Sequence, residues 1–309
     1  MPVAQPGALI AGEPELLAEG LGWPEGPSLL ADGTIVFVES YASQVSMWTP
    51  ERGRERYAYT AGAPNSCVVG ADDVVYVCQN GGTVGAWRAD EMVAPSIQRI
   101  AHRGARAETL ITEVAGRSLR GPNDLVFGRD GALYFTDPGV YDPASPDPSY
   151  ILGLRGDGSG EVLIAFPQPV FPNGLAVTDD GAVVWDESYT GRVRRMSGRG
   201  EEPEDLGRLP GENPIPDGLK LGADGRLYVT DLAAGGIHVL LPDGTPVGFL
   251  AVGVAPTNCV FAGDVLIVTD AGRLADSAEC SSAGRLWRIP IRASGQPLLR
   301  GAIVAGAPS

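Results

Sequence analysis

Cysteine and histidine are scarce in this chain of 309 residues, which holds four cysteines and two histidines. No two cysteines form a Cys-x-x-Cys pair, and a chain of this length does not need disulfides to complete its core. A Ser-His-Asp hydrolase is disfavoured, because only His102 and His238 could act as the base and no Gly-x-Ser-x-Gly elbow occurs. We expect free thiols, with a Cys67–Cys78 bridge as the alternative, at Cys67, Cys78, Cys259 and Cys280.

Positive charge is also in short supply, because 23 lysines and arginines stand against 38 acidic residues and the formal net charge is −15. Such a chain is repelled by nucleic acid and by anionic membrane surfaces, and it tolerates or attracts cations. No apolar run is long enough to span a membrane, and the N-terminal segment lacks the basic start and apolar stretch of a signal peptide. We expect a cytoplasmic protein with a small-molecule partner, and we make no prediction of its oligomeric state.

The chain is rich in glycine (43) and proline (26), and one pattern in it repeats six times. Each copy begins with a carboxylate or carboxamide residue and continues as two apolar runs joined by a turn. In four copies the turn contains Asp-Gly, which is a strong signal for a β-hairpin. The six copies begin at Glu25, Asn65, Asn123, Asn173, Asp217 and Asn258.

Further strands follow each hairpin. Third strands are expected from Ser43, Gly82, Tyr150, Gly191, Gly236 and Gly284, and weaker fourth strands in ERYAYT, SIQRIA, EVLIAF, EDLGRL and PVGFLA. The sixth unit lacks a fourth strand, and the N-terminal stretch PELLAEG is the candidate to complete it. This pattern predicts an all-β fold, a six-bladed β-propeller of four-stranded blades closed by an N-terminal strand. Because no linker-like composition divides the chain, we expect one domain over residues 1–309.

The repeats predict where the polar residues gather. The first strand of each propeller blade lines the central channel, so the six starting residues should surround one mouth. Long loops over residues 138–150 and 271–283 and a long connection over residues 88–119 open on that side, which marks it as the binding face. A second, mostly acidic set belongs to the same mouth: Glu39, Gln79, Asp137, Glu187, Asp231 and Asp270.

Two interpretations of the first set are open. Asn and Asp at the start of a strand can simply satisfy free backbone groups, which suffices for Asn65. Glu is a weak local cap, however, and carboxylates that face a narrow channel are costly unless a cation joins them. We therefore favour a metal site, in which hard oxygen donors select Ca²⁺, or else Mg²⁺ or Mn²⁺. Its ligands would be Glu25, Asn123, Asn173 and Asp217.

Several segments together resemble the gluconolactonase and senescence-marker-protein (regucalcin) family of six-bladed propellers. They are GWPEGPSLLADG, RGPNDLVFGRDGALYFTDP, FPNGLAVTDDG, IPDGLKLGADGRLYV and PTNCVFAG, in the family's order and spacing. The resemblance implies a divalent metal, often Ca²⁺ and in some members Zn²⁺, held by Glu25, Asn173 and Asp217, with Asn123 as a ligand or substrate contact. It also implies hydrolysis of sugar-acid lactones. The chain departs from the family at Glu39, where many members have Asp.

For such a reaction we expect Asp217 as general base and Glu25 as ligand, with the reverse assignment open. Asp124 is expected to support the ligands. Two alternatives to a lactonase remain: an organophosphate-type phosphotriesterase on the same metal site, and a non-catalytic propeller that binds calcium or another ligand. Arg120 could equally be a surface charge, and the two tyrosines could equally be loop packing. The candidate substrate contacts are Arg120, Asn123, Tyr141, Tyr150 and Asn258.

Overall fold

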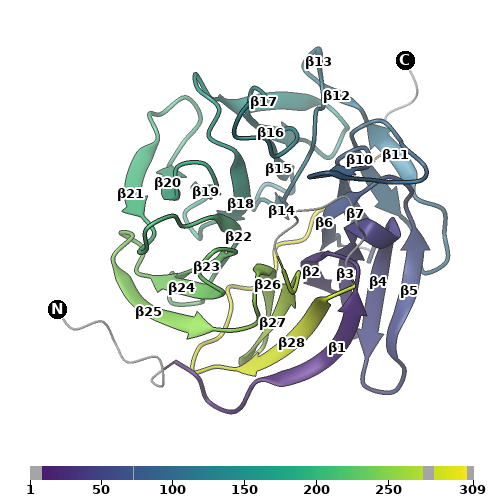
Figure 1. Cartoon of the computed structure of the whole chain (residues 1–309). Helices are drawn as coiled ribbons and strands as arrows, with labels where there is room; N and C mark the ends of the chain where they lie inside the picture. Colours follow the sequence, from purple (N-terminus) through teal and green to yellow (C-terminus); the bar gives the residue numbers. More distant parts are fainter. Residues whose placement is uncertain (1–8, 72, 274–281, 305–309) are drawn as a thin grey trace.

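Six sheets, each of four antiparallel strands, surround a central channel in the computed structural model (Figure 1). The structure describes residues 9–71, 73–273 and 282–304, so Asp72 of the second repeat and Cys280 lie outside it. The arrangement confirms the predicted six-bladed β-propeller.

The strands of the first three blades are β2 (Pro24–Leu29), β3 (Ile35–Glu39), β4 (Gln44–Thr49) and β5 (Gly53–Tyr59); β6 (Pro64–Val69), β7 (Val75–Gln79), β10 (Ser96–Ile100) and β11 (Glu108–Ile111); and β14 (Leu125–Phe127), β15 (Leu133–Asp137), β16 (Tyr150–Leu154) and β17 (Gly160–Ala165). Those of the last three are β18 (Pro172–Val177), β19 (Val183–Glu187), β20 (Arg192–Met196) and β21 (Glu204–Arg208); β22 (Pro216–Leu221), β23 (Leu227–Asp231), β24 (Gly236–Leu240) and β25 (Pro246–Ala251); and β26 (Pro256–Ala262), β27 (Val265–Asp270), β28 (Gly284–Pro290) and β1 (Glu15–Leu21).

The N-terminal strand completes the last blade, as predicted. Strand β1 pairs antiparallel with β28, and Leu21 lies opposite Gly284. Leu21 is fully buried and packs with Phe37 of the first blade and Leu286 of the last. The two ends of the propeller are therefore joined both by strand pairing and by apolar packing.

The second blade corrects the sequence prediction. The stretch from Gly82 is not its third strand, because β8 (Thr83–Val84) and β9 (Trp87–Arg88) pair only with each other. The third strand is β10, which had been expected as the fourth, and β11 is the fourth. The physical reason is burial: β10 offers Ile97 and Ile100 to the core, whereas the pattern from Gly82 has no comparable apolar face. A second short hairpin, β12 (Glu113–Val114) with β13 (Arg117–Ser118), precedes the third blade.

Helix is limited, in the part of the chain that the structure describes, to the 3₁₀ turn η2 (Ser40–Ala42). No helix there is long and apolar enough to cross a membrane. Cys67, Cys78 and Cys259 are buried free thiols, as expected, and the Cys67–Cys78 bridge is not formed. Burial raises the pKa of all three, that of Cys259 to about 12. They stay protonated and are poor metal ligands.

The C-terminal segment, residues 292–304, crosses the face that carries the Asp-Gly turns. The Gln296 amide N–H donates to Leu221 O at 2.9 Å, and its side chain donates to Val177 O at 2.9 Å. Arg300 donates to Leu29 O at 2.8 Å, and Ile303 N donates to the Tyr76 hydroxyl at 2.9 Å. The segment thus ties blades five, four, one and two together at the end of the channel opposite the predicted mouth.

Candidate functional site

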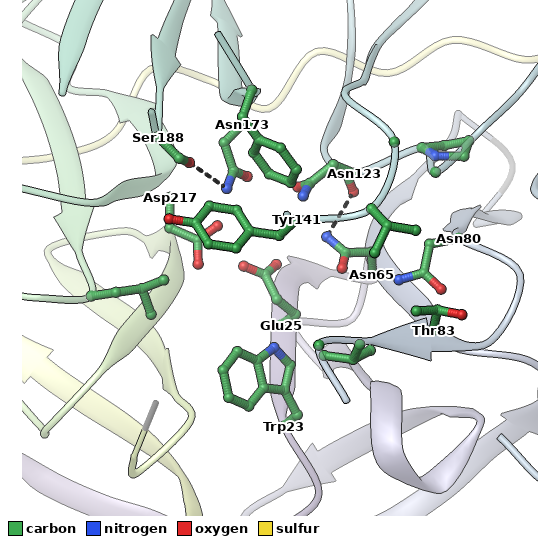
Figure 2. Close-up of a pocket in the computed structure, with 18 of the residues that line it drawn as sticks. Trp23, Glu25, Asn65, Asn80, Thr83, Asn123, Tyr141, Asn173, Ser188 and Asp217 are labelled. Carbon is green, nitrogen blue, oxygen red and sulfur yellow. Dashed lines mark hydrogen bonds between the residues drawn. The ribbon is translucent and has the colours of Figure 1, made fainter. Parts of the chain in front are cut away.

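A cavity of about 390 Å³ lies at the predicted mouth, within the size range of small-molecule sites. Figure 2 shows Glu25, Asn173 and Asp217 pointing toward one another across it, from β2, β18 and β22. Asn65 and Asn123 also line the cavity. The structure therefore brings five of the six repeat-starting residues to one place.

The strands hold these side chains in the channel through bulges. The β-ladder register shifts between Glu25 and Ser28, and similar shifts between Pro172 and Leu175 and between Pro216 and Leu219 span Asn173 and Asp217. Bulges re-aim a side chain and are common beside active sites. A proline precedes each of the three residues at the strand start, where no ladder N–H is needed.

A glycine after each of these residues lets neighbouring blades approach closely. A Cβ on Gly174 would lie 2.4 Å from Asp217 O, and a Cβ on Gly218 would lie 2.3 Å from Asn258 Cγ. No real Cβ tolerates such contacts, so only glycine permits this spacing of the first strands. The glycine that follows each candidate ligand thus determines how closely the polar side chains approach one another.

The Glu25 carboxylate is 2% exposed and only partly satisfied. Its Oε2 accepts hydrogen bonds from Gly26 N and from Asn258 Nδ2, the latter at 3.2 Å. Its Oε1 is buried and has no hydrogen-bond partner among the described residues. Burial, followed by the charges of Asp217 and Asp124, raises the pKa of Glu25 well above its usual range. An unpartnered buried carboxylate oxygen is costly, and a cation beside it would remove that cost.

Asp217 and Asn173 complete this side of the cavity. Burial, followed by the charge of Asp124, raises the pKa of Asp217 well above its usual range, although the Asn173 amide lowers it. Asn173 Nδ2 donates to Ser188 Oγ at 3.1 Å, and Ser188 Oγ in turn donates to Pro216 O at 2.7 Å. These bonds fix the Asn173 amide and leave its Oδ1 available as a ligand.

A second layer of charge lies beneath Glu25. Asp124, 2% exposed, accepts hydrogen bonds from Ser66 Oγ at 2.7 Å, Lys220 Nζ at 3.3 Å and Asn258 Nδ2 at 3.4 Å. Burial lowers the pKa of Lys220, but the charge and hydrogen bond of Asp124, with smaller contributions from Cys259 and Glu25, together raise it above its usual value, so the lysine stays charged. Asp124 was expected from the sequence to support the ligands. Lys220 was not predicted, although a lysine in the channel-facing strand PDGLKL was a visible signal.

Asp186 was also missed. It lies in β19 with no exposure, and both of its carboxylate oxygens lack a hydrogen-bond partner of normal geometry among the described residues. Burial, then the charges of Asp217 and Asp124, raises its pKa well above the usual range. An acid within the otherwise apolar stretch AVVWD was its signal in the sequence.

The donor set fits a hard cation only if amides take part. Within residues 9–71, 73–273 and 282–304, no three His, Cys, Asp or Glu side chains are placed to hold a metal. Carboxamide oxygens would have to supplement Glu25 and Asp217, as the sequence analysis proposed. Oxygen donors of this kind suit Ca²⁺ better than zinc.

The second, mostly acidic set of residues at the channel mouth has a structural role. Most of its members accept N–H groups from the loop that leads into the first strand of their own blade: Gln79 from Ala63 at 2.8 Å, Asp137 from Gly121 at 2.8 Å, Asp231 from Ile215 at 3.1 Å, Asp270 from Ala255 at 2.9 Å and Glu39 from Gly22 at 3.0 Å. Glu39 is also paired with Arg54 at 2.7 Å. None of these side chains lines the cavity. Their spacing reflects backbone satisfaction, not a second ligand shell.

Asp137 gives a pH prediction. Burial raises its pKa to about 6, although Gly121 N and Arg120 N donate to it. Between about pH 4 and pH 6 the folded state therefore binds more protons there than the unfolded chain, and the free energy of unfolding should fall as pH rises. In urea titrations across this window, Asp137→Asn should remove up to about 3 kcal/mol of that fall. An unchanged slope would contradict the prediction.

Asp231 is the matched control, because its shift has the opposite sign. Burial raises its pKa, but hydrogen bonds from His238 and Ile215 N outweigh burial and lower it. Its contribution to stability is present above the pKa of an unfolded Asp and is lost as pH falls through the folded pKa. Asp231→Asn should therefore reduce the fall of the free energy of unfolding at acid pH. It should leave unchanged the fall between about pH 4 and pH 6 that Asp137 causes.

Three of the expected substrate contacts do not reach the cavity, which is a correction to the sequence analysis. Arg120 Nη1 is paired with Asp147 Oδ1 at 2.7 Å on the surface, because the loop over residues 138–150 supplies that carboxylate. Tyr150 packs under Arg117, whose guanidinium lies 5.1 Å from its ring. Asn258 is 1% exposed and lies beneath Glu25. Tyr141 and Asn123 do line the cavity, as expected.

Known proteins resemble this chain in sequence and in fold. The family model of the SMP-30/gluconolactonase/LRE-like region matches residues 23–272. The chain belongs to this family. The gluconolactonase of Zymomonas mobilis subsp. mobilis is 26% identical to it in an alignment of 287 residues that covers 80% of this chain and 75% of the relative. The resemblance seen in the sequence is therefore confirmed.

Solved structures of the family share the fold of this member. A gluconolactonase from Xanthomonas campestris superposes with a TM-score of 0.74 at 23% identity, over 92% of this chain and 91% of its own. A calcium-binding regucalcin from Agrobacterium tumefaciens superposes with a TM-score of 0.69 at 16% identity, over 98% and 99%. At these identities the likeness shows the architecture alone.

Proposed function

We propose that this protein is a metal-dependent hydrolase that opens lactones at the channel mouth. The observation that carries the proposal is the unpartnered, buried Oε1 of Glu25 beside Asp217, in a cavity large enough for a small molecule. Membership of a family that includes the Zymomonas gluconolactonase supports the reaction class. The calcium binding of the Agrobacterium regucalcin supports a divalent cation.

Glu25, Asn173 and Asp217 would hold the metal, with Asn123 as a further ligand or a substrate contact. Their hard oxygen donors favour Ca²⁺, with Zn²⁺, Mn²⁺ and Mg²⁺ as alternatives. When bound, such an ion polarises a carbonyl oxygen and stabilises the negative charge that develops on it.

Asp217 is the proposed general base. It takes a proton from a water molecule whose oxygen bonds to the lactone carbonyl carbon, and burial and the charge of Asp124 raise the pKa of this carboxyl group, which makes it a stronger base. The bond from the carbonyl carbon to the ring oxygen then breaks, and the proton passes to the leaving alkoxide. Glu25, with Oε2 fixed by Gly26 N and Asn258 Nδ2, serves as ligand only.

Chelation tests the proposal directly. The purified protein is assayed for metal content and for hydrolysis of a panel of lactones, before and after treatment with a chelator and after addition of each candidate cation. We expect hydrolysis to disappear with the metal and to return with it. Full activity without metal would contradict the metal dependence, and bound calcium with no hydrolysis of any lactone would favour the non-catalytic alternative.

A further inference from the structure

The residue two positions before each of the three main candidate ligands is apolar. Trp23, Phe171 and Ile215 precede Glu25, Asn173 and Asp217 with one proline between, and all three line the cavity. The segments WPEG, FPNG and IPDG therefore place a ligand on the cavity floor and an apolar side chain on its wall. The apolar half of this pattern was not predicted from the sequence.

Two of these wall residues have an unusual backbone. Trp23 has φ of 55° and Phe171 has φ of 53°, in the left-handed region that bulky side chains rarely occupy. Such conformations persist only where the surrounding structure enforces them, and they cluster at functional sites. The fold thus holds both rings at the mouth against their local preference.

Further aromatic rings hold the wall in place. Tyr141 meets Phe171 edge-on at a centroid distance of 5.0 Å, and Tyr189 lies 5.2 Å from both. On the other side Trp23 lies 5.7 Å from Tyr41. Figure 2 shows Tyr141 and Trp23 on either side of Glu25. The apolar wall is therefore preformed.

Three asparagines of the cavity each have one amide atom bonded to the protein. Asn65 Nδ2 donates to Asn123 O at 3.4 Å, and Asn173 Nδ2 donates to Ser188 Oγ. Asn80 Oδ1 accepts from Gly82 N at 3.1 Å. No lysine, arginine or histidine is among the described lining residues, since Arg120 is turned away to Asp147. A ligand with a carboxylate would find no cationic side chain among these lining residues and would face Glu25 and Asp217 instead.

From this arrangement we infer the substrate class: uncharged lactones that bear an alkyl or aryl substituent, with the ester at the floor and the substituent against Tyr141, Phe171 and Ile215. Sugar-acid lactones, with a hydroxyl on nearly every carbon, would leave those hydroxyls facing the apolar wall, where they lose hydrogen bonds to water. The inference rests on the proposed lactonase function.

A series with one ring size tests the inference. The substrates are δ-valerolactone, δ-decalactone, which adds a pentyl chain, and glucono-1,5-lactone, which adds hydroxyl groups. We expect kcat/KM for δ-decalactone to exceed that for δ-valerolactone by at least about tenfold, because the chain leaves water for an apolar wall. Glucono-1,5-lactone should fall below both. A glucono-1,5-lactone value above that of δ-decalactone would overturn the inference and leave the lactonase function intact.

Substitutions in the cavity wall test which side chains give the preference for the alkyl-substituted lactone. Ile215→Ala and Tyr141→Ala should each lower the ratio of δ-decalactone to δ-valerolactone by about fivefold or more, with smaller effects on δ-valerolactone itself. Tyr141→Phe keeps the ring and should keep the ratio. Leu298→Ala is the control, since Leu298 is exposed and lies beside a different cavity on the opposite face. An equal change of ratio in the control would refute the assignment of the wall.

If no lactone is hydrolysed, the binding of non-hydrolysable lactams separates the proposed lactonase function from the proposed apolar wall. The probes are the corresponding lactams, δ-valerolactam and its 6-pentyl derivative, titrated calorimetrically into the metal-loaded protein. Tighter binding of the pentyl lactam without any lactone turnover would refute the lactonase function and uphold the apolar wall. Equal or weaker binding of the pentyl lactam would refute the inference, whatever the turnover.

Discussion

Asp217→Asn should lower kcat/KM for lactone hydrolysis about a thousandfold and at the same time make the metal-free protein more stable. The activity falls because an amide cannot take the proton from water, a loss within the range for general bases. The stability rises because the native carboxylate is buried beside Asp124, and burial and that charge raise its pKa. A carboxyl group whose pKa is higher in the folded than in the unfolded chain destabilises the fold at neutral pH, so the free energy of unfolding should rise when an amide replaces it.

Single-turnover kinetics and urea titration with chelator check the two parts of this result, and metal affinity separates the role of a ligand from that of a base. Glu25→Gln should weaken metal binding but recover much of its kcat at saturating metal, whereas Asp217→Asn should not, because only the latter lacks the base. If the two variants behave the other way round, the roles of the two carboxylates are reversed. Asp179→Asn, at an exposed residue paired with Arg129 beside the Asp-Gly turns, should change neither quantity.

Most of the fold could be predicted from the sequence because its signals are local and repeated. Asp-Gly turns between apolar runs identify hairpins in four copies, and the six repeated hairpins predict a closed ring that the N-terminal strand completes. The error in blade two arose where a short hairpin, β8 and β9, is inserted between the second and third strands. A local pattern cannot distinguish such an insertion from the next strand, since the distinction depends on which segment the core buries.

The candidate site could be predicted only where a residue's position in the repeat determines that its side chain faces the channel. Glu25, Asn173 and Asp217 begin their repeats and face the channel, so their convergence follows from the topology. Lys220 and Asp186 sit within strands, and their position beside the other charges depends on contacts between blades. The position of Arg120 outside the cavity could not be predicted either, because its partner Asp147 comes from a loop whose path has no sequence rule.

Lys220→Met should destabilise the metal-free protein by about 3 kcal/mol, the lower end of the range for breaking a buried ion pair. The lysine is bonded to Asp124 at 3.3 Å, and its side chain is only 21% exposed. Its charge also lowers the pKa of Glu25, Asp217 and Asp186. Without it these acids lose their compensating cation. The free energy of unfolding in urea, measured with a chelator, gives the size of the loss.

Added divalent cation should recover part of this stability, because a cation in the cavity supplies the compensation that Lys220 gave. The variant should also bind the metal about tenfold more tightly, since one source of like-charge repulsion is gone. A loss of the same size with and without metal would contradict this account and leave Lys220 as a packing residue only. Arg226→Met in the same blade is the control, because its exposed pair with Asp224 is worth at most about 1 kcal/mol.

The double variant Lys220→Met with Asp124→Asn decides whether charge is the cause. If Lys220 stabilises the fold by compensating Asp124, removing both charges should cost less than the sum of the two single changes. The coupling should reach at least about 1 kcal/mol, as is usual for groups in direct contact. Additive losses would mean that the lysine contributes through its aliphatic chain. A coupled result would identify Lys220 as the built-in cation that lets this channel keep its acids close together before any metal binds.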